Sequence, residues 1–393
     1  MSKAAPVRRP RDRKQQIINS AAQLFCEQGY HNVTLAEVAS SVGITAGALY
    51  RHFRNKDELL LRTVQDGIHT VEIGIAESPD LDALLQSTAA GALDRRGLPL
   101  LWQRESRHLP SAEREQLRHA VSDIADKIGV LIRSSRPELE PADVTVLSWA
   151  VIAVFGSFGM RRIPLPKNEF RRLHLRLSSA VARSQFNTEG APQESAPLSD
   201  VAMRTGVELP RREQLVTAAI RLFAERGFQS VTMDDIGTAA GITGSSVYKH
   251  FPTKIALLVA ALERGHARLH TGMGRALALG KTPTEVLDLL THKHIEFALE
   301  NSQLISILGS EREELPEENR KVSNRAQRDY LNVWMRVLAE CRPELKPEVV
   351  RITVDAVFTV IGNLAAMRSL ATRTDLSGHL FDLATALLWH EAA

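Results

Sequence analysis

Cysteine is scarce in this sequence: Cys26 and Cys341 are the only two among 393 residues, and they lie far apart. This scarcity argues against a disulfide framework and a cysteine-rich metal site, and it fits a reducing compartment. No run of 18 apolar residues occurs, and the basic N-terminus leads into polar sequence. We therefore expect no membrane span, no signal peptide and no membrane partner, and we predict a cytoplasmic location.

Aromatic residues are also few, at 5%, although hydrophobic residues make up 44% of the chain. Because aromatic and β-branched residues fill strands, this composition favours an all-α fold. The net charge of +3 is too small to indicate a nucleic-acid partner by itself. Basic residues nevertheless crowd the first fourteen positions, namely Lys3, Arg8, Arg9, Arg11, Arg13 and Lys14. Such an arm either binds a polyanion or serves as a solubilising tail.

The sequence motifs of the common enzyme classes are missing. We find no P-loop, no dinucleotide-binding fingerprint and no nucleophile elbow. The densest candidate metal cluster is His292, His294 and Glu296. His292 and Glu296 would share one helix face, but a third ligand is not evident, and a solvated helix face is the favoured interpretation. We predict no catalytic residue, no metal and no cofactor, with a metal-dependent enzyme as the less favoured alternative.

What the sequence does contain is a long internal repeat. The stretch GITAGALYRHF at 43–53 recurs as GITGSSVYKHF at 241–251, and the same offset of 198 residues holds without a gap from Arg13 and Arg211 onward. Further along, RPEL at 136–139 recurs at 342–345, so the offset grows to 206. Between the copies, roughly 186–209 is polar and reads as a linker. A period this long indicates two whole domains of one ancestry rather than a solenoid.

Each copy predicts short helices around a tight turn. In the first, Gly29 ends one helix, Thr34 opens the next with a capping-box pattern, and Gly43 ends it. Thr45 then caps a third helix, to about His52. Thr232 and Thr243 are the corresponding caps in the second copy. This is a helix-turn-helix, whose second helix enters the major groove of DNA, and Leu49 and Phe53 are expected to face its core.

The chemistry of the third helix suits a groove and a phosphate backbone. Ala46, Gly47 and Ala48 are small enough for the backbone to approach base edges closely. Tyr50 can reach a phosphate with its hydroxyl, and Arg51 offers further donors. The alternative is that Tyr50 and its neighbours only pack.

The pattern Thr-x-x-x-Leu-Tyr-x-His-Phe-x-x-Lys resembles the DNA-binding domain of the tetracycline-repressor (TetR) family over about 50 residues in each half. The resemblance implies three DNA-binding helices followed by a larger helical domain that binds an inducer and dimerises. Together with the reasoning above, the residues expected to contact double-stranded operator DNA are Thr34, Thr45, Ala46, Gly47, Tyr50, Arg51, His52, Lys56, Thr232, Thr243, Gly244, Ser245, Tyr248, Lys249, His250 and Lys254. A chain with both domains also resembles the double-TetR regulators of actinobacteria, a group associated with lipid uptake and catabolism.

The domain boundaries follow from the repeat. We expect a basic arm at 1–12, a first DNA-binding domain at 13–60 and a first helical ligand or packing domain at 61–185. A linker at 186–209 precedes a second DNA-binding domain at 210–258 and a second helical domain at 259–393. Family homodimers place two identical recognition helices about one DNA turn (~34–36 Å) apart. This chain carries both, so we predict a monomer that acts as an intramolecular pseudo-dimer on an operator that need not be palindromic.

The last two helices of each half are the predicted pairing surface, at 142–161 with 167–183 and at 347–368 with 375–389. Their apolar runs suit either mutual packing or separate cores. An apolar pocket for a lipid, acyl-CoA or sterol-like effector would be lined by Trp102, Trp149, Phe155, Phe158, Phe297, Trp334 and Phe358. Ordinary core packing is the alternative for each of these residues, and a regulator that binds DNA without an effector is the alternative function.

Overall fold

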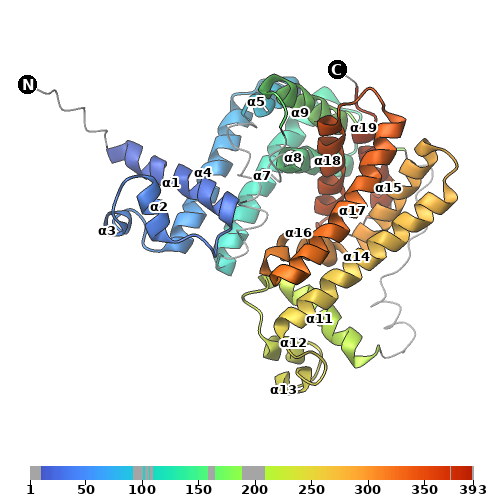
Figure 1. Ribbon diagram of the computed structural model, residues 1–393. Helices are drawn as coiled ribbons and strands as arrows, with labels where there is room; N and C mark the ends of the chain where they lie inside the picture. The colour runs from blue at the N-terminus through green and yellow to red at the C-terminus, as the bar shows by residue number, and fades with distance from the viewer. Residues whose placement is uncertain are drawn as a thin grey trace, which may run out of the picture. The chain divides into compact units, whose positions relative to one another are not determined.

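The computed structural model of the chain describes residues 10–91, 101, 106, 109–157, 164–187, 209–371 and 373–391 (Figure 1). Most of the basic arm, most of the linker and the pocket candidates Trp102 and Phe158 lie outside these residues. The described residues form helices and no strand, which confirms the predicted all-α fold. They divide into two compact units, the first up to Leu139 and the second comprising Glu140–Ser157 and the described residues from 164 onward.

The first unit holds the first DNA-binding domain and the helices that support it. Helices α1 and α4 pack on each other, and α2 and α3 close the small domain at one end (Figure 1). Phe25, Leu49, Phe53 and Leu60 lie fully inside its core, and the predicted inward positions of Leu49 and Phe53 are confirmed. The helices of this unit are α1 (Pro10–Gln28), α2 (Leu35–Ser41), α3 (Ala46–Leu49), α4 (Lys56–Ala76), α5 (Leu81–Gly91) and α7 (Ser111–Ser135).

The second unit repeats this domain and adds a larger helical body. Helix α11 packs on α14 as α1 does on α4, and α15 to α17 build outward from α14. The last two helices of the first half, α8 and α9, also belong to this unit. Its elements are α8 (Pro141–Ser157), α9 (Lys167–Ala182), α11 (Arg211–Arg226), α12 (Met233–Ala239), α13 (Gly244–Val247), α14 (Lys254–Leu279), α15 (Pro283–Glu300), α16 (Ser302–Ser310), the 3-10 turn η3 (Arg312–Glu314), α17 (Glu317–Cys341), α18 (Pro347–Ala365) and α19 (Leu376–Leu388).

Helices α8 and α18 pack along each other, and α9 packs on α8 and on α19. Val151, Val154, Val357 and Ile361 are fully buried in this four-helix arrangement. The two apolar runs that the sequence left open therefore pack together within one unit, with helices from both halves of the chain. Although α8 is strongly apolar, no helix among the described residues is long and apolar enough to cross a bilayer.

Four glycines shape the two DNA-binding domains at matching places. Gly29 and Gly227 follow the first helix of each copy with φ of +82° and +76°. Gly43 and Gly241 follow the second helix with φ of +69° and +71°. These values lie in the left-handed region, where a residue with a Cβ atom is strained. The predicted helix ends at Gly29 and Gly43 therefore have a backbone cause.

The predicted capping boxes are present in both copies. The Thr34 hydroxyl accepts from the backbone N–H of Glu37, whose carboxylate in turn accepts from the Thr34 N–H at 2.7 Å. Thr232 and Asp235 make the same reciprocal pair. Because its carboxylate accepts these hydrogen bonds, the pKa of Glu37 lies below its ordinary value, and the same holds for Asp235.

The second helix-turn-helix is packed more tightly than the first. A Cβ atom on Gly244 would lie 2.9 Å from the Cα atom of Asp234, and one on Gly237 would lie 2.9 Å from the backbone nitrogen of Gly244. The first copy has alanines at the matching positions, Ala39 and Ala46. Helices α12 and α13 therefore cross at a distance that only glycine permits.

We expect Gly244→Ala to loosen the second helix-turn-helix, because the new methyl group must push α12 away from α13. Overpacking of this kind costs about 1–3 kcal/mol. The loss should appear as faster amide hydrogen exchange across 233–247 and as a lower thermal midpoint. Gly47→Ala is the matched control, since a Cβ atom there meets nothing within 4 Å. Equal exchange in the two variants would contradict the tight crossing.

Candidate nucleic-acid interface

The tip of the first DNA-binding domain presents one exposed face. Tyr50 is 56% exposed although it is a large aromatic residue, and Thr45, Gly47 and Arg51 are exposed around it. Thr45 caps α3 by accepting from the backbone N–H of Ala48. The remaining candidates of this copy differ in exposure: Thr34 is exposed, whereas Ala46, His52 and Lys56 are half-buried.

The second domain presents a matching face with different chemistry. Tyr248 is also 56% exposed, and Ser245, Lys249 and His250 are exposed beside it. The exposed Thr232 and Thr243 complete the described candidates of this face, together with the half-buried Lys254.

Gly244 differs from the other members of the predicted set. It is buried against α12, where Asp234 lies too close for a side chain. Its identity is fixed by helix packing. The sequence signal was present in the paired change of Ala39 and Ala46 to glycine, but only the structure shows that the two positions touch.

Thr243 also departs from its expected role. Its backbone is extended, as at an N-cap, but its side chain accepts no hydrogen bond from the helix backbone. The hydroxyl instead lies 3.0 Å from that of Ser245 and 2.9 Å from that of Ser246. These serines replace Gly47 and Ala48 of the first copy. A small cluster of hydroxyl groups therefore lies at the N-terminus of α13, whereas the residues that match the two serines in α3 carry no hydroxyl.

Lys56 and Lys254 brace the turn after the first helix of each domain. The Lys254 ammonium donates to the backbone oxygen of Phe228 at 2.8 Å and lies 4.3 Å from the centre of its ring. Lys254 also donates to the backbone oxygen of Gln229 at 3.3 Å. Lys56 donates to the backbone oxygen of the matching residue, His31, at 3.3 Å and lies 4.3 Å from the centre of the Tyr30 ring. Burial lowers the pKa of Lys254 below its ordinary value.

Two further basic positions support the helix-turn-helix. In the sequence analysis Arg13 was counted with the basic arm, and no role was assigned to Arg211 or Arg212. Arg13 donates to the backbone oxygen of Val42 at 2.9 Å, and Arg211 donates to that of Ala240 at 3.2 Å. Both oxygens belong to the C-cap of the second helix. Arg212 lies 4.0 Å from the centre of the Phe251 ring. The recurrence of Arg13 as Arg211 at the repeat offset was the available signal.

The pocket candidates of the second half fill space against one another. Trp334 is fully buried and meets the Phe358 ring edge-on at 5.0 Å, and His294 stacks on Phe358 at 4.3 Å. Burial lowers the pKa of His294 to about 3, so the ring is neutral at physiological pH. Phe297 lies in the core shared with α11. This is the packing of a core, so a pocket at these residues stays a prediction.

The first half offers less of its predicted pocket. Trp149 and Phe155 lie half-buried on α8, and Phe155 stacks on His174 of α9 at 5.3 Å. Burial lowers the pKa of His174 to about 3. Trp102 and Phe158 lie outside the described residues, so the pocket of the first half stays a prediction.

The three side chains of the candidate metal cluster at 292–296 each contact a different partner. His292 stacks on Phe381 at 4.1 Å, His294 faces Phe358, and Glu296 pairs with Lys293 at 2.5 Å. These contacts separate the three side chains and favour a role in packing and surface pairing, as the sequence interpretation preferred.

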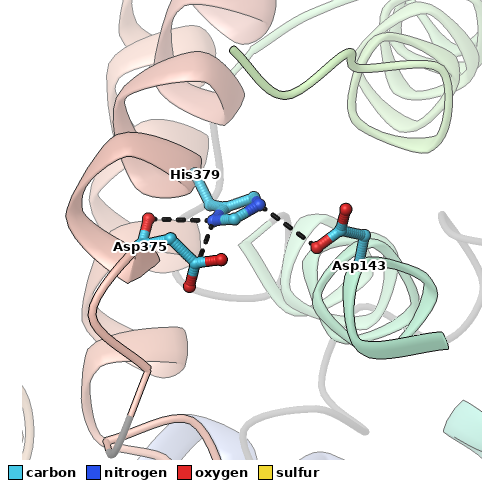
Figure 2. Close-up of side chains that lie close together, drawn as sticks. All are labelled: Asp143, Asp375 and His379. Carbon is cyan, nitrogen blue, oxygen red and sulfur yellow. Dashed lines mark hydrogen bonds and ion pairs between the residues drawn. The ribbon is translucent and has the colours of Figure 1, made fainter. Parts of the chain in front are cut away.

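A different group brings two carboxylates and an imidazole together. Figure 2 shows His379 of α19 between Asp143 of α8 and Asp375, with Nε2 3.2 Å from the Asp143 carboxylate. The spacing would suit a cation. Arg373 already supplies one, because its guanidinium lies 2.8 Å from Asp143 and 2.6 Å from Asp375. Its hydrogen bonds hold the pKa of Asp375 below the ordinary value. The group is an ion-pair cluster, and its donor set does not call for a metal.

Comparison with known proteins agrees with this architecture. The profile described as "Bacterial regulatory proteins, tetR family" matches residues 17–63 and again 215–261. A second profile, "Tetracyclin repressor-like, C-terminal domain", matches 280–366. The matched segments thus cover both DNA-binding domains and most of the second helical body.

Individual relatives match over shorter shares. The HTH-type transcriptional repressor KstR of Mycobacterium tuberculosis is 26% identical over 133 residues, which are 32% of this chain and 60% of KstR. The HTH-type transcriptional activator FasR of Mycolicibacterium smegmatis is 33% identical over 103 residues, 25% of this chain and 47% of FasR. The solved structure of the ketosteroid transcriptional regulator KstR2 of Mycobacterium tuberculosis covers 37% of this chain and 78% of its own, at 25% identity and a TM-score of 0.35.

The chain spans about half the length of the curated relatives it matches. The part that recurs is the helix-turn-helix with its supporting helices, found twice at the positions where the exposed faces of α3 and α13 lie. The chain belongs to the TetR family of bacterial regulatory proteins and carries that family's DNA-binding domain in two copies.

Proposed function

We propose that the protein is a transcriptional regulator, acting in the cytoplasm, in which one chain binds one operator through two unlike recognition helices. The observation that carries this proposal is the pair of matching exposed faces at α3 and α13. Each face has an exposed tyrosine above a buried apolar anchor and a braced turn. Repression is the proposed direction because KstR, which matches over the larger share, is a repressor; FasR is an activator.

The shared and the differing residues of the two faces have separate roles in this proposal. Tyr50 and Tyr248 hold phosphates, since their hydroxyls project from exposed positions that do not vary between the copies. Gly47 becomes Ser245 and Arg51 becomes Lys249, all four exposed at the tips. Because these positions lie where base edges are read, the two half-sites of the operator differ in sequence.

A small effector is the second part of the proposal, and the larger body of the second unit supports it. The Ser323 hydroxyl and the Gln327 carbonyl oxygen, both on α17, are buried with no hydrogen-bond partner among the described residues. Buried polar atoms of this kind are completed by water or by a ligand. On the neighbouring α14, burial lowers the pKa of His266 to about 4. We propose a mainly apolar effector, such as a lipid, an acyl-CoA or a sterol, with a polar group toward α17.

A regulator without an effector is the second candidate function. The mutual packing of Trp334, Phe358 and His294 favours it, because these aromatic residues occupy the space that a ligand would need. The two candidates differ in what a ligand does to the complex with DNA.

We expect Tyr50→Phe and Tyr248→Phe each to weaken operator binding about tenfold, the effect of one hydrogen bond to a charged group. Sequence preference should stay the same and the thermal midpoint should not move, since both hydroxyls are exposed. Titration of operator and scrambled DNA by fluorescence anisotropy measures both effects. A change in base preference would refute the assignment of these residues to phosphates.

The second test concerns the unlike recognition helices. Ala46→Gly, Gly47→Ser, Ala48→Ser and Arg51→Lys together give the first helix the tip of the second. This variant should prefer an operator in which the second half-site is repeated as a palindrome, by more than tenfold over the natural site, because each mismatched base pair costs about 1–3 kcal/mol. Footprinting and binding stoichiometry are the measurements. Wild-type protein binding a perfect palindrome as two independent chains would overturn the proposal.

The third test separates the two candidate functions. Acyl-CoAs, sterols and fatty acids are screened by thermal shift, and an effector at 100-fold above its Kd should stabilise the protein by about 2.7 kcal/mol. The same compound should release operator DNA. Ser323→Ala with Gln327→Leu should reduce this response while leaving DNA binding intact. If no compound both stabilises the protein and releases DNA, the regulator acts without such an effector.

A further inference from the structure

The four helices shared by the two halves of the chain are related position by position. An offset of 206 carries the buried residues of α9 onto buried residues of α19, for example Leu177 onto Leu383. The same offset carries Val151 of α8 onto Val357 of α18. Residues that lie 206 positions apart are thus buried alike in both helix pairs. Each residue of α8 and α9 therefore has a definite counterpart in α18 and α19.

One side of this interface holds the ion-pair cluster. Asp143, at the start of α8, faces the His379 ring at 3.2 Å (Figure 2) and the Arg373 guanidinium at 2.8 Å. The His379 side chain is only 4% exposed. Its other nitrogen, Nδ1, lies 2.8 Å from the backbone oxygen of Asp375, so the ring can donate to an oxygen on each side when both nitrogens carry hydrogen. Asp143 therefore completes the contacts of a buried imidazole and a half-buried guanidinium.

The counterpart side is built from different residues. Val349 stands in the position of Asp143, and Leu173 stands in that of His379. Here a different ion pair joins the two halves: the Lys346 ammonium donates to both carboxylate oxygens of Glu169, at 3.1 and 2.9 Å. The counterpart of Lys346 is Glu140, an acid. The two sides of the interface thus differ in charge at positions 143 and 349 and at positions 140 and 346.

Each pairing of like halves would lose one of these two sets of contacts, although Asp375 and Lys167 keep the charges of Glu169 and Arg373 at the related positions. If two first halves paired, Glu140 would replace Lys346 opposite Glu169, and two carboxylates would meet. If two second halves paired, Val349 would replace Asp143 beside His379, whose Nε2 atom would lose its carboxylate partner. Like charges in contact and buried polar groups without a partner both disfavour an interface.

We propose that these unlike charges select the partner of the α8–α9 surface, which is the α18–α19 surface of the same chain. Asp143 with His379 and Arg373 is one recognition element, and Lys346 with Glu169 is the other. The inference concerns how the chain pairs with itself and does not depend on DNA binding. If this is so, the interface itself favours the pairing of unlike halves, and the covalent connection between them is a second, separate cause.

The connection between the halves has to be removed to test this. A tether raises the effective concentration of one half near the other to the millimolar range, which alone favours pairing within the chain. We therefore place a protease site in 188–208, let the intact chain fold, cut it, and dissociate and refold the cut protein in urea. Native mass spectrometry then measures the complexes of first with second half, first with first, and second with second.

The cut wild-type protein should return almost entirely to the complex of first with second half, whereas unselective pairing would give about half. Asp143→Val with His379→Leu places the counterpart residue at each position, and like-half complexes should then appear. Lys346→Glu should also produce complexes of first with first half. Adding Glu169→Lys together with Glu140→Lys should suppress them, because the pair between unlike halves is restored with reversed polarity while two first halves would oppose like charges. This last comparison decides the question if the first variant does not refold.

Random pairing of the wild-type halves would overturn the proposal, as would unchanged pairing in both Asp143→Val/His379→Leu and Lys346→Glu. Intact wild-type chains that exchange halves to form mixed dimers would overturn the assignment of the partner to the same chain. Operator binding by the uncut variants reports separately on the proposed function, because no substituted residue lies in either DNA-binding domain.

Discussion

Helix α8 has no polar face to leave in water. Val144, Leu147, Val151 and Val154 are buried along it, and so is Val146 on another side. A helix that is apolar around its whole circumference has to be covered on all sides. In this protein α9 covers one part of it and α18, from the other half of the chain, covers another, while Trp149 and Phe155 stay half-buried. The first half therefore needs a partner, and the internal repeat supplies one without a second polypeptide.

The two copies have diverged in coupled steps that keep each core intact. In the first DNA-binding domain the Tyr30 hydroxyl donates to Asp57. In the second copy these positions are Phe228 and Ile255, and both pack into the apolar core. A tyrosine without its acceptor would leave a half-buried hydroxyl unsatisfied, so the two positions change together. The glycines of α12 and α13 are a second coupled change, and here the shared constraint is the small space between the two helices.

Local features of this fold could be predicted from sequence, because their causes lie within a few residues. Gly29 and Gly43 end helices through their own backbone conformation, and Thr34 caps α2 through a residue three positions away. The burial of Gly244 could not be predicted, since it depends on how closely two helices cross. The contact of Asp143 with Arg373 joins residues 230 positions apart. No periodicity or motif marks such a pair, so the sequence showed that the halves have a common ancestry but not how they bind each other.

A symmetric dimer repeats every contact across its two-fold axis, so residue i meets residue j and residue j meets residue i. Any ion pair at such an interface occurs twice, and any change in the recognition helix alters both half-sites. The fused chain is released from both conditions. Asp143 meets His379 on one side while Val349 and Leu173 occupy the related positions on the other. The interface and the recognition helices can therefore diverge independently in each half. The preferential pairing of unlike halves that we propose would also keep the two proposed DNA-binding faces in one particle.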